Sequence, residues 1–207
     1  MDILIATRNK GKVTEFSEYF KPKNINIYDL NSLSIDSSPE EPYDSFLMNS
    51  FHKARYYSQF TEMAILSDDS GLQVECLNDA PGVYSARYGG ENLSDHDRNN
   101  YLISNLPKEE IKPRAKFKCV LTLYIRNKWV SFFNGECEGY LIRTQKGVNG
   151  HGYDPIFYVE EYDKTFAEIT MTEKNKISHR GNAIRNMIDT LKDNYPQYIN
   201  QKDKEMA

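Results

Sequence analysis

The chain has 207 residues, of which 39% are hydrophobic and 27% charged, and its formal net charge at pH 7 is −4. This length suffices for one large domain or two small ones, and such a chain buries roughly 70% of its unfolded surface without disulfide or metal staples. The slightly acidic balance argues against a broad nucleic-acid-binding surface. A small anionic ligand stays possible, because a few local cations can outweigh the global charge.

The three cysteines, Cys76, Cys119 and Cys137, lack the spacing of metal ligands. An odd number in mostly apolar contexts indicates reduced core thiols, as in cytosolic proteins. The first residues already have a strand pattern, and neither a signal peptide nor a long apolar run is present. We therefore expect a cytoplasmic location.

Residues 3–6 read as a short buried strand, and Val13, Phe16 and Phe20 then recur at helical spacing, so a helix should begin near Gly11. The loop between them is polar and cationic, and it consists of Thr7, Arg8, Asn9, Lys10, Gly11 and Lys12. A helix N-terminus offers free N–H groups and a favourable dipole to an anion. Phosphate binding is one interpretation and an ordinary loop with solvated cations the other; the glycine spacing of a Walker P-loop is missing.

Residues 25–28 predict a second strand, and residues 44–59 a helix. Its inward positions should be Phe46 or Leu47, then Phe51, Ala54 and Tyr57. The preceding loop carries Glu40 and Glu41. They compensate the helix dipole in one interpretation; in the other, one of them supplies a third carboxylate to the acidic pair described next.

Asp68 and Asp69 follow the apolar run 63–66, where we expect a buried strand to end, and Ser70 and Gly71 come next. Two neighbours at a strand-to-turn break can converge on one point. Two close carboxylates raise each other's pKa unless a cation neutralises them, and such oxygen ligands suit Mg²⁺. The alternative is a polar turn, because Asp, Ser and Gly are common turn residues.

The middle of the chain has strand and turn patterns. Residues 71–76 should continue outward as a strand, residues 81–90 should form a loop, and Ser94 should cap a helix that ends at Leu106 with Tyr101, Leu102 and Leu106 inward. Residues 115–126 alternate as a strand, and Asn127-Lys128 predicts a hairpin turn into a strand at 129–133. A further strand is expected near residues 139–142.

The last third of the chain contains two polar stretches. Residues 147–155 form a glycine-rich loop in which His151 and Tyr153 could offer ring faces and Asp154 an acceptor, although a long surface turn explains it equally. Ser178 is a plausible N-cap for a helix. His179 and Arg180 would then lie in its first turn, where the dipole disfavours cations; this placement suggests a ligand nearby or simply two solvated cations. We expect a frayed tail over residues 200–207.

Five motifs in one order carry a resemblance to a known family. They are Thr7-Arg8-Asn9-Lys10-Gly11-Lys12, Ser67-Asp68-Asp69-Ser70-Gly71-Leu72, Pro81-Gly82-Val83-Tyr84-Ser85-Ala86-Arg87-Tyr88, Gly152-Tyr153-Asp154-Pro155-Ile156-Phe157 and Ser178-His179-Arg180-Gly181. A looser match runs from Glu40-Glu41 to Lys53-Ala54. The whole chain thereby resembles the inosine/xanthosine triphosphate pyrophosphatase family, which hydrolyses non-standard purine nucleoside triphosphates.

The resemblance implies an α/β fold with a long central mixed sheet, helices on both sides and two lobes of one domain flanking a cleft. It also implies a homodimer, Mg²⁺ dependence, and release of pyrophosphate and the nucleoside monophosphate. By position, Asp69 would be proton acceptor and metal ligand, with Asp68 and Glu40 or Glu41 completing the metal site. The remaining implied roles are substrate contacts: Thr7, Asn9, Lys12 and Lys53, with Arg8, Lys10 and Gly11 in the same loop, for the triphosphate; Ser70 beside it; and His151, Gly152, Tyr153, Asp154, Lys174, His179 and Arg180 for the base.

Four positions depart from the family pattern: Arg8, Tyr43, Met48 and His151, the last standing where phenylalanine normally stacks on the purine. A histidine ring can still stack, with less apolar area and a titrating ring. Two other readings stay open: a pyrophosphatase of similar fold that acts on modified pyrimidine nucleotides, and a catalytically silent nucleotide-binding protein.

Overall fold

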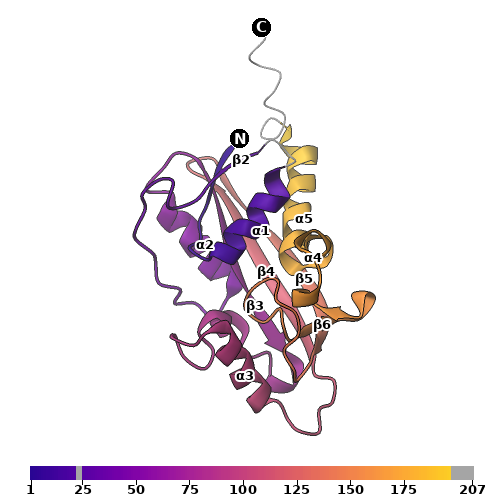
Figure 1. The fold of residues 1–207 in the computed structure, drawn as a ribbon. Coiled ribbons are helices and arrows are strands. Elements are labelled where there is room, and N and C mark those ends of the chain that lie inside the picture. Colours follow the sequence, from indigo (N-terminus) through magenta and orange to yellow (C-terminus); the bar gives the residue numbers. More distant parts are fainter. Residues whose placement is uncertain (22–24, 197–207) are drawn as a thin grey trace. The chain divides into compact units, whose positions relative to one another are not determined.

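The structure is a computed structural model that describes residues 1–21 and 25–196; the tail predicted to be frayed lies outside these residues. Figure 1 shows the helices α1 (Lys10–Phe20), α2 (Phe46–Tyr57), α3 (Asp95–Asn105), α4 (Met171–Ile177) and α5 (His179–Asn194). The strands are β1 (Asp2–Ile5), β2 (Asn26–Tyr28), β3 (Ala64–Val74), β4 (Arg114–Ile125), β5 (Trp129–Leu141), β6 (Phe157–Val159) and β7 (Lys164–Thr165). In the described part of the chain, no helix is both long and apolar enough to span a membrane.

The seven strands form one sheet in the order β2-β1-β3-β4-β5-β6-β7. β1 runs parallel to β2 and β3, whereas β6 runs antiparallel to β5 and β7. The predicted α/β class with a central mixed sheet is therefore confirmed. Chain contacts divide the molecule into two compact units. Unit 1 comprises Met1–Asp69, Val120–Gly135 and the residues from Gly181 onward; unit 2 comprises Ser70–Cys119 and Glu136–Arg180.

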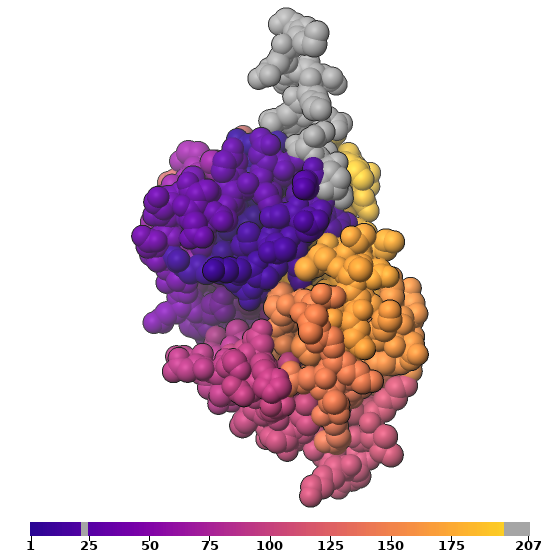
Figure 2. Space-filling model, in the orientation of Figure 1, coloured from indigo at the N-terminus to yellow at the C-terminus, as the bar shows by residue number. Residues whose placement is uncertain are grey.

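Unit 1 is built on β1 and its two parallel neighbours. Ile3, Leu4 and Ile5 are at most 1% exposed, so β1 is buried on both faces, as parallel strands usually are. α1 buries Phe16 and Phe20, and α2 buries Phe46, Ala54 and Tyr57. In the space-filling view, the indigo-to-violet residues of this N-terminal segment form one continuous surface (Figure 2).

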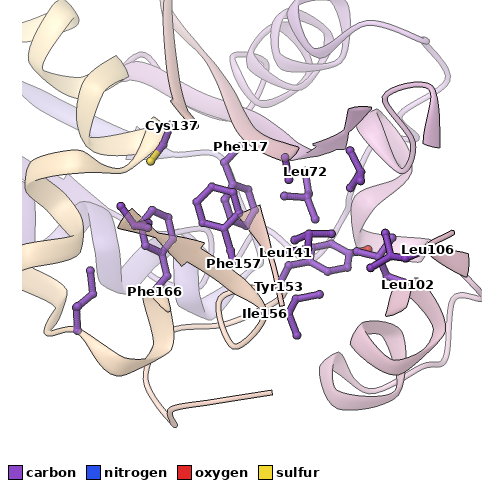
Figure 3. Close-up of a cluster of buried hydrophobic side chains, with 14 residues drawn as sticks. Leu72, Leu102, Leu106, Phe117, Cys137, Leu141, Tyr153, Ile156, Phe157 and Phe166 are labelled. Atoms are coloured by element: carbon purple, nitrogen blue, oxygen red, sulfur yellow. The ribbon is translucent and has the colours of Figure 1, made fainter. Parts of the chain in front are cut away.

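Unit 2 has its own hydrophobic core, which Figure 3 shows in close-up. The rings of Phe117 and Phe157 lie 4.7 Å apart between centroids, and Phe166 packs on both. Tyr153, Leu141, Leu72 and other buried side chains extend the cluster toward α3, which contributes Leu102. Burial of each large side chain of this kind is worth about 1.5–3 kcal/mol, so unit 2 has ample apolar area for independent packing.

Several element predictions are confirmed. α1 begins at Lys10 after an N-cap at Asn9, α3 follows the N-cap Ser94, and Asn127-Lys128 forms the turn between β4 and β5. On α2 the inward residue is Phe46, and Leu47 is exposed.

Other element predictions are wrong. β3 does not end before Asp68 but continues to Val74, and β5 is one strand rather than two. In both cases, tertiary pairing sustains a strand through residues whose propensity is low. Tyr101 is 43% exposed instead of inward. The helix α4 and the short strands β6 and β7 were not predicted. Ser178 ends α4 and, as predicted, directly precedes the helix α5.

Candidate functional site: two clusters of buried charge

The continuous strand β3 places its adjacent aspartates differently from the prediction. Side chains alternate along a strand, so Asp68 and Asp69 point to opposite faces rather than converging. Ser67 and Asp69 share the face of Ile65, which packs against Ala54 and Tyr57 of α2. Asp68 and Asp69 are 1% and 4% exposed, respectively. Each carboxylate is therefore buried on its own side of the strand, and each needs its own compensation.

Lys12 of α1 compensates Asp68. Its ammonium forms an ion pair and a hydrogen bond with Asp68 Oδ1 across 56 positions of sequence. Asn9 fixes the start of α1, because its side-chain oxygen accepts from the backbone N–H of Lys12 at 3.2 Å. Thr7 Oγ1 in turn accepts from the N–H of Asn9, also at 3.2 Å. The cationic loop is thus ordered by its own polar side chains, and it presents a lysine to the buried aspartate.

Lys53 of α2 lies against Asp69 on the other face. Its Nζ is 3.3 Å from Asp69 Oδ1 and 2.5 Å from Glu41 Oε1. Glu41 is only partly exposed, whereas its neighbour Glu40 is exposed. The structure therefore brings Glu41 to this cluster and not Glu40. We call Lys12, Glu41, Lys53, Asp68 and Asp69, all in unit 1, the carboxylate–lysine cluster.

Burial dominates the electrostatics of Asp69. Desolvation raises the pKa of Asp69 above its ordinary value, Glu41 and Asp68 add to the rise, and Lys53 and Lys12 oppose it. Burial acts in the other direction on Lys53, but the carboxylates of Asp69, Glu41 and Asp68 outweigh it and raise the pKa of Lys53. Asp69 is thus a carboxylate of increased basicity beside a firmly charged ammonium.

Asp69 Oδ2 is buried and has no hydrogen-bond partner in the described chain. An unsatisfied buried carboxylate oxygen is costly, and it is a natural ligand for a hard cation. Within residues 1–21 and 25–196, no group of three or more His, Cys, Asp and Glu side chains is arranged to hold a metal ion by itself. Mg²⁺, however, commonly binds through one or two carboxylates together with waters and substrate phosphates. Asp69, whose Oδ2 is the buried oxygen without a hydrogen-bond partner, fits that mode.

The buried face of α2 also holds a residue that the sequence analysis did not single out. Asn49 Nδ2 donates to the carbonyl of Tyr43 at 2.8 Å, and its Oδ1 accepts from the N–H of Tyr43 at 3.0 Å. This two-way clamp fixes the backbone two residues after Glu41. A polar stripe at helical spacing, Asn49, Ser50 and Lys53, was the signal that could have identified it.

Arg8 has an internal partner in unit 1. Its Nη2 donates to the carbonyl of Ile35 at 2.7 Å and to that of Ser37 at 3.3 Å. Tyr57 Oη also donates to Ser37 O, at 3.3 Å. The guanidinium therefore holds the loop that leads to Glu40 and Glu41, and its predicted contact with phosphate stays a prediction. Lys10 is exposed at the start of α1, and Gly11 is partly buried.

In unit 2, Ser70 receives a hydrogen bond from Arg180 Nη2 at 2.9 Å. The next residue explains why two of the motifs belong together. A Cβ at Gly71 would lie 2.2 Å from Gly82 O and 2.5 Å from Ser85 Oγ. Ser85 Oγ accepts from the N–H of Leu72 at 2.9 Å and donates to Gly82 O at 2.6 Å. Only glycine lets the 3₁₀ turn Gly82–Arg87 pack this closely on β3.

His151, Asp154 and Lys174, which we call the Lys174 cluster, also come together in unit 2. Lys174 Nζ lies 2.6 Å from Asp154 Oδ2, and the side chains are 3% and 2% exposed. The same oxygen accepts from the N–H of His151 at 2.8 Å. Asp154 therefore closes the glycine-rich loop onto α4, while the N–H of Gly152 donates to Asp95 at 2.7 Å. His151 as a whole residue is partly exposed, but its ring Nε2 is buried.

One expectation for this region is wrong, and so is one of two alternative interpretations. Tyr153 does not offer its ring to a ligand: it is 4% exposed, packs in the unit 2 core (Figure 3), and donates from its hydroxyl to Ser85 O at 2.9 Å. Burial accordingly raises the pKa of Tyr153. His179 and Arg180 are not solvated cations but are 4% and 2% exposed. The His179 ring stacks on Phe117 at 4.6 Å.

Comparison with known proteins agrees with this geometry. A profile of the Ham1 family matches residues 3–190. The dITP/XTP pyrophosphatase of Desulforamulus reducens is 42% identical over 192 residues, which cover 92% of this chain and 96% of that protein. The Ham1 protein of Staphylococcus aureus superposes with a TM-score of 0.81 at 36% identity, covering 93% of this chain and 99% of that one.

A third match points the same way. The nucleoside-triphosphatase / dITP/XTP pyrophosphatase of Mycobacterium abscessus superposes with a TM-score of 0.69 at 34% identity and covers 91% of this chain and 99% of that one. The matches span nearly the full length on both sides, so they include both units and both charge clusters. The resemblance inferred from the motifs is confirmed, and the chain belongs to the Ham1 family.

Proposed function

We propose that this chain hydrolyses non-standard purine nucleoside triphosphates such as dITP, XTP and ITP to the nucleoside monophosphate and pyrophosphate. The observation that carries the proposal is the carboxylate–lysine cluster, in which Asp69 keeps one buried oxygen without a hydrogen-bond partner next to the Lys53 ammonium. The relatives from Desulforamulus reducens and Mycobacterium abscessus are named dITP/XTP pyrophosphatases, which supports the same substrate class.

The triphosphate is assigned to the loop at the start of α1 and to the lysines behind it. Thr7, Asn9 and Gly11 surround a helix N-terminus, which favours anions through its free N–H groups and its dipole. Lys12 and Lys53 supply the positive charge that phosphoryl transfer requires. Arg8 and Lys10 add to the field of the loop. Because both lysines are already held by aspartates, they would meet the substrate in a fixed position.

Asp69 is assigned the role of accepting the proton from the attacking water. Its raised pKa makes it a stronger base than an ordinary aspartate, and general bases of this kind contribute about 10²–10⁴-fold to a rate. Asp69, with Glu41 nearby on the same side of β3, would hold Mg²⁺; the predicted contribution of Asp68, which lies on the other side with Lys12, stays a prediction. When bound, the ion would polarise phosphate oxygens and neutralise charge that develops on them. Lys53 opposes the rise in the pKa of Asp69, and Ser70 lies next to Asp69 in the chain.

Base recognition is assigned to unit 2. Inosine and xanthosine carry a carbonyl at position six, where adenosine carries an amino group. Lys174, His179, Arg180 and the backbone N–H groups of the glycine-rich loop are donors, and His151 is the ring that would stack on the base. Donors aimed at a carbonyl can discriminate against an amino group by ~10⁴ or more, because they would otherwise stay unpaired. Asp154 orients this loop through Lys174 and His151.

A homodimer in the cytoplasm belongs to the same proposal and is supported by the family resemblance. The deciding experiment is a substrate panel of ITP, XTP, dITP, ATP, GTP and a modified UTP, with pyrophosphate and phosphate detected separately, with and without Mg²⁺. We expect pyrophosphate release from ITP, XTP and dITP in Mg²⁺ and little from ATP. Preferential turnover of the modified UTP, or no turnover of any nucleotide, would refute the proposal.

A further inference from the structure

Three hydroxyl groups form a closed, fully buried network in unit 1 beside the carboxylate–lysine cluster. Ser50 of α2, Ser67 of β3 and Thr122 of β4 are each 0% exposed. Ser50 Oγ lies 3.1 Å from Ser67 Oγ and 2.8 Å from Thr122 Oγ1. Ser67 Oγ donates to the carbonyl of Ser50 at 2.6 Å. The network thus joins one helix to two neighbouring strands.

Chemistry allows a direction of these hydrogen bonds in which every hydroxyl is satisfied, and Ser50 Oγ also lies 3.4 Å from the Ser67 carbonyl oxygen. Because the Ser67 hydroxyl gives its hydrogen to the Ser50 carbonyl, its oxygen can accept from Ser50 Oγ. Ser50 Oγ can in turn accept from Thr122. In this order, Thr122 to Ser50 to Ser67 to the Ser50 carbonyl, every hydroxyl hydrogen has an acceptor. A satisfied buried network rigidifies its surroundings, whereas deletion of one member leaves a buried polar group unpaired.

The network lies directly behind the reactive residues. Ser50 precedes Lys53 by one helical turn, and residues three apart are neighbours on a helix surface. Ser67 precedes Asp69 by two positions, which places both on the same face of β3. Along α2 and along the same face of β3, the hydroxyl network therefore comes first in sequence and the Lys53–Asp69 pair follows it. The distance from Lys53 Nζ to Asp69 Oδ1 is 3.3 Å. On β4, the neighbouring Tyr124 packs against apolar residues of the α2 side.

Small apolar side chains would fill this space without leaving a buried polar group unpaired. Ala54 lies one turn after Ser50, and Ile65 lies two positions before Ser67, so the hydroxyls adjoin the apolar cluster of these residues. Small apolar residues at 50, 67 and 122 would make no hydrogen-bond demand there. Three mutually dependent hydroxyls instead restrict how α2 slides or rotates over the sheet, since each bond tolerates only a narrow range of distance and angle.

We propose that Ser50, Ser67 and Thr122 are positioning residues that fix α2 on β3 and β4 so that Lys53 stays aligned with Asp69. None of the three touches the substrate; they act through Lys53 and Asp69. The inference deepens the proposed function and rests on it for its kinetic readout. A second readout, on stability, is independent of activity.

The kinetic experiment compares Thr122→Val, which keeps the shape of the side chain but deletes the hydroxyl, with Thr122→Ser, which keeps the hydroxyl. A displacement of the order of 1 Å at a reacting group can lower rates by up to 10²-fold. We expect Thr122→Val and Ser50→Ala to lower kcat for ITP by about tenfold with KM within about twofold of wild type, and Thr122→Ser to keep kcat within about twofold.

Ser58→Ala is the matched control. Ser58 is a buried serine at the C-cap of the same helix, and its hydroxyl donates within α2, to Arg55 O at 2.8 Å. The substitution Ser58→Ala should lower the urea midpoint of unfolding without changing kcat. If Thr122→Val likewise lowers only the midpoint and leaves kcat intact, the three hydroxyls are merely structural and the proposal is wrong.

The stability experiment is a double-mutant cycle between Thr122→Val and Lys53→Met, in which the urea midpoint of unfolding is measured for each variant. Coupled residues give non-additive losses, whereas independent sites add. We expect Thr122→Val to lower the midpoint less in the Lys53→Met background than in wild type, because the pair that it aligns is already gone. Additive losses would overturn the positioning role. If the wild-type protein turns over no nucleotide at all, the proposed function fails, and the cycle alone decides this inference.

Discussion

The Lys53 ammonium lies 3.3 Å from Asp69 Oδ1, yet Asp69 still has a raised pKa. The desolvation of Asp69 thus outweighs the attraction of the lysine. Burial therefore raises the pKa of this carboxyl group and makes its ionised form a cost to the stability of the native state. Such perturbed pKa values are common among catalytic groups.

Asp69→Asn should therefore abolish activity and stabilise the protein. Loss of the general base should lower kcat by about 10²–10⁴-fold while nucleotide still binds. As pH rises from the ordinary pKa of 3.8 to the raised pKa of folded Asp69, the unfolded chain loses its proton first, so the native state becomes less stable over that window. Asn does not titrate, so its stabilising effect should be small near pH 4 and larger at pH 7.

Urea unfolding at a series of pH values, together with pyrophosphate release, measures both effects. Asp189→Asn is the control, because Asp189 is a surface aspartate with 69% side-chain exposure that pairs with Lys192. It should change neither quantity appreciably. Near wild-type turnover of Asp69→Asn, or a stability gain that does not depend on pH, would contradict the assignment of Asp69.

Glu41 and Glu40 provide a matched pair of neighbouring glutamates. Glu41 forms an ion pair with Lys53 at 2.5 Å, whereas Glu40 is exposed. Glu41→Gln should lower kcat/KM by about tenfold or more, because it removes a charge that positions Lys53 and that could bind the metal ion. Glu40→Gln should stay within about twofold of wild type, as is usual for surface changes. Equal effects of the two substitutions would remove Glu41 from the site.

Much of the fold follows from the sequence because the physical signals are local. The cap at Ser94 and the alternation along residues 115–125 depend on neighbours in the chain, and both predictions are confirmed. The continuity of β3 could not be predicted from local signals. Asp and Gly disfavour strands, but pairing within the sheet keeps Asp68 and Asp69 in β3. Their charges are compensated by lysines 56 and 16 positions away.

The sequence predicted which residues belong to the site, but not how they are arranged in space. The motifs supplied Lys12, Lys53 and Asp69, but nothing in the sequence separates Glu40 from Glu41 or shows that Asn49 clamps Tyr43. The burial of Lys174 was equally unpredictable, because lysine is rarely buried without a partner and its partner Asp154 is 20 positions away. These properties arise only when distant elements pack.

Lys174→Met should destabilise the protein strongly, because it leaves Asp154 as an uncompensated buried carboxylate. Removal of one member of a buried ion pair typically costs about 3–5 kcal/mol. The double variant Lys174→Met/Asp154→Asn should recover part of that loss, since no buried charge remains. Chemical denaturation of the two variants and of Asp154→Asn checks the prediction. A double variant that is no more stable than Lys174→Met would show that the two residues are not coupled.

His151→Phe tests base stacking. The larger apolar ring should bind the base more tightly and lower KM for ITP. His96→Phe, a change of the same kind on α3, is the control and should leave KM unchanged. Equal KM values for ITP in wild type and His151→Phe would exclude His151 from stacking.

Gly71→Ala should disrupt the site through one methyl group. The added Cβ would lie 2.2 Å from the carbonyl oxygen of Gly82 and 2.5 Å from Ser85 Oγ, so the 3₁₀ turn must move away from β3. Overpacking of this kind costs about 1–3 kcal/mol. We expect kcat to fall as well, because strain at Gly71 acts on Ser70 and Asp69, which immediately precede it on β3. Ser85→Ala in the same chain should not restore activity, because the closer clash is with backbone rather than with the serine side chain. Recovery of both stability and kcat in the double variant would show that the serine hydroxyl, and not the Gly82 carbonyl, sets the limit on this approach.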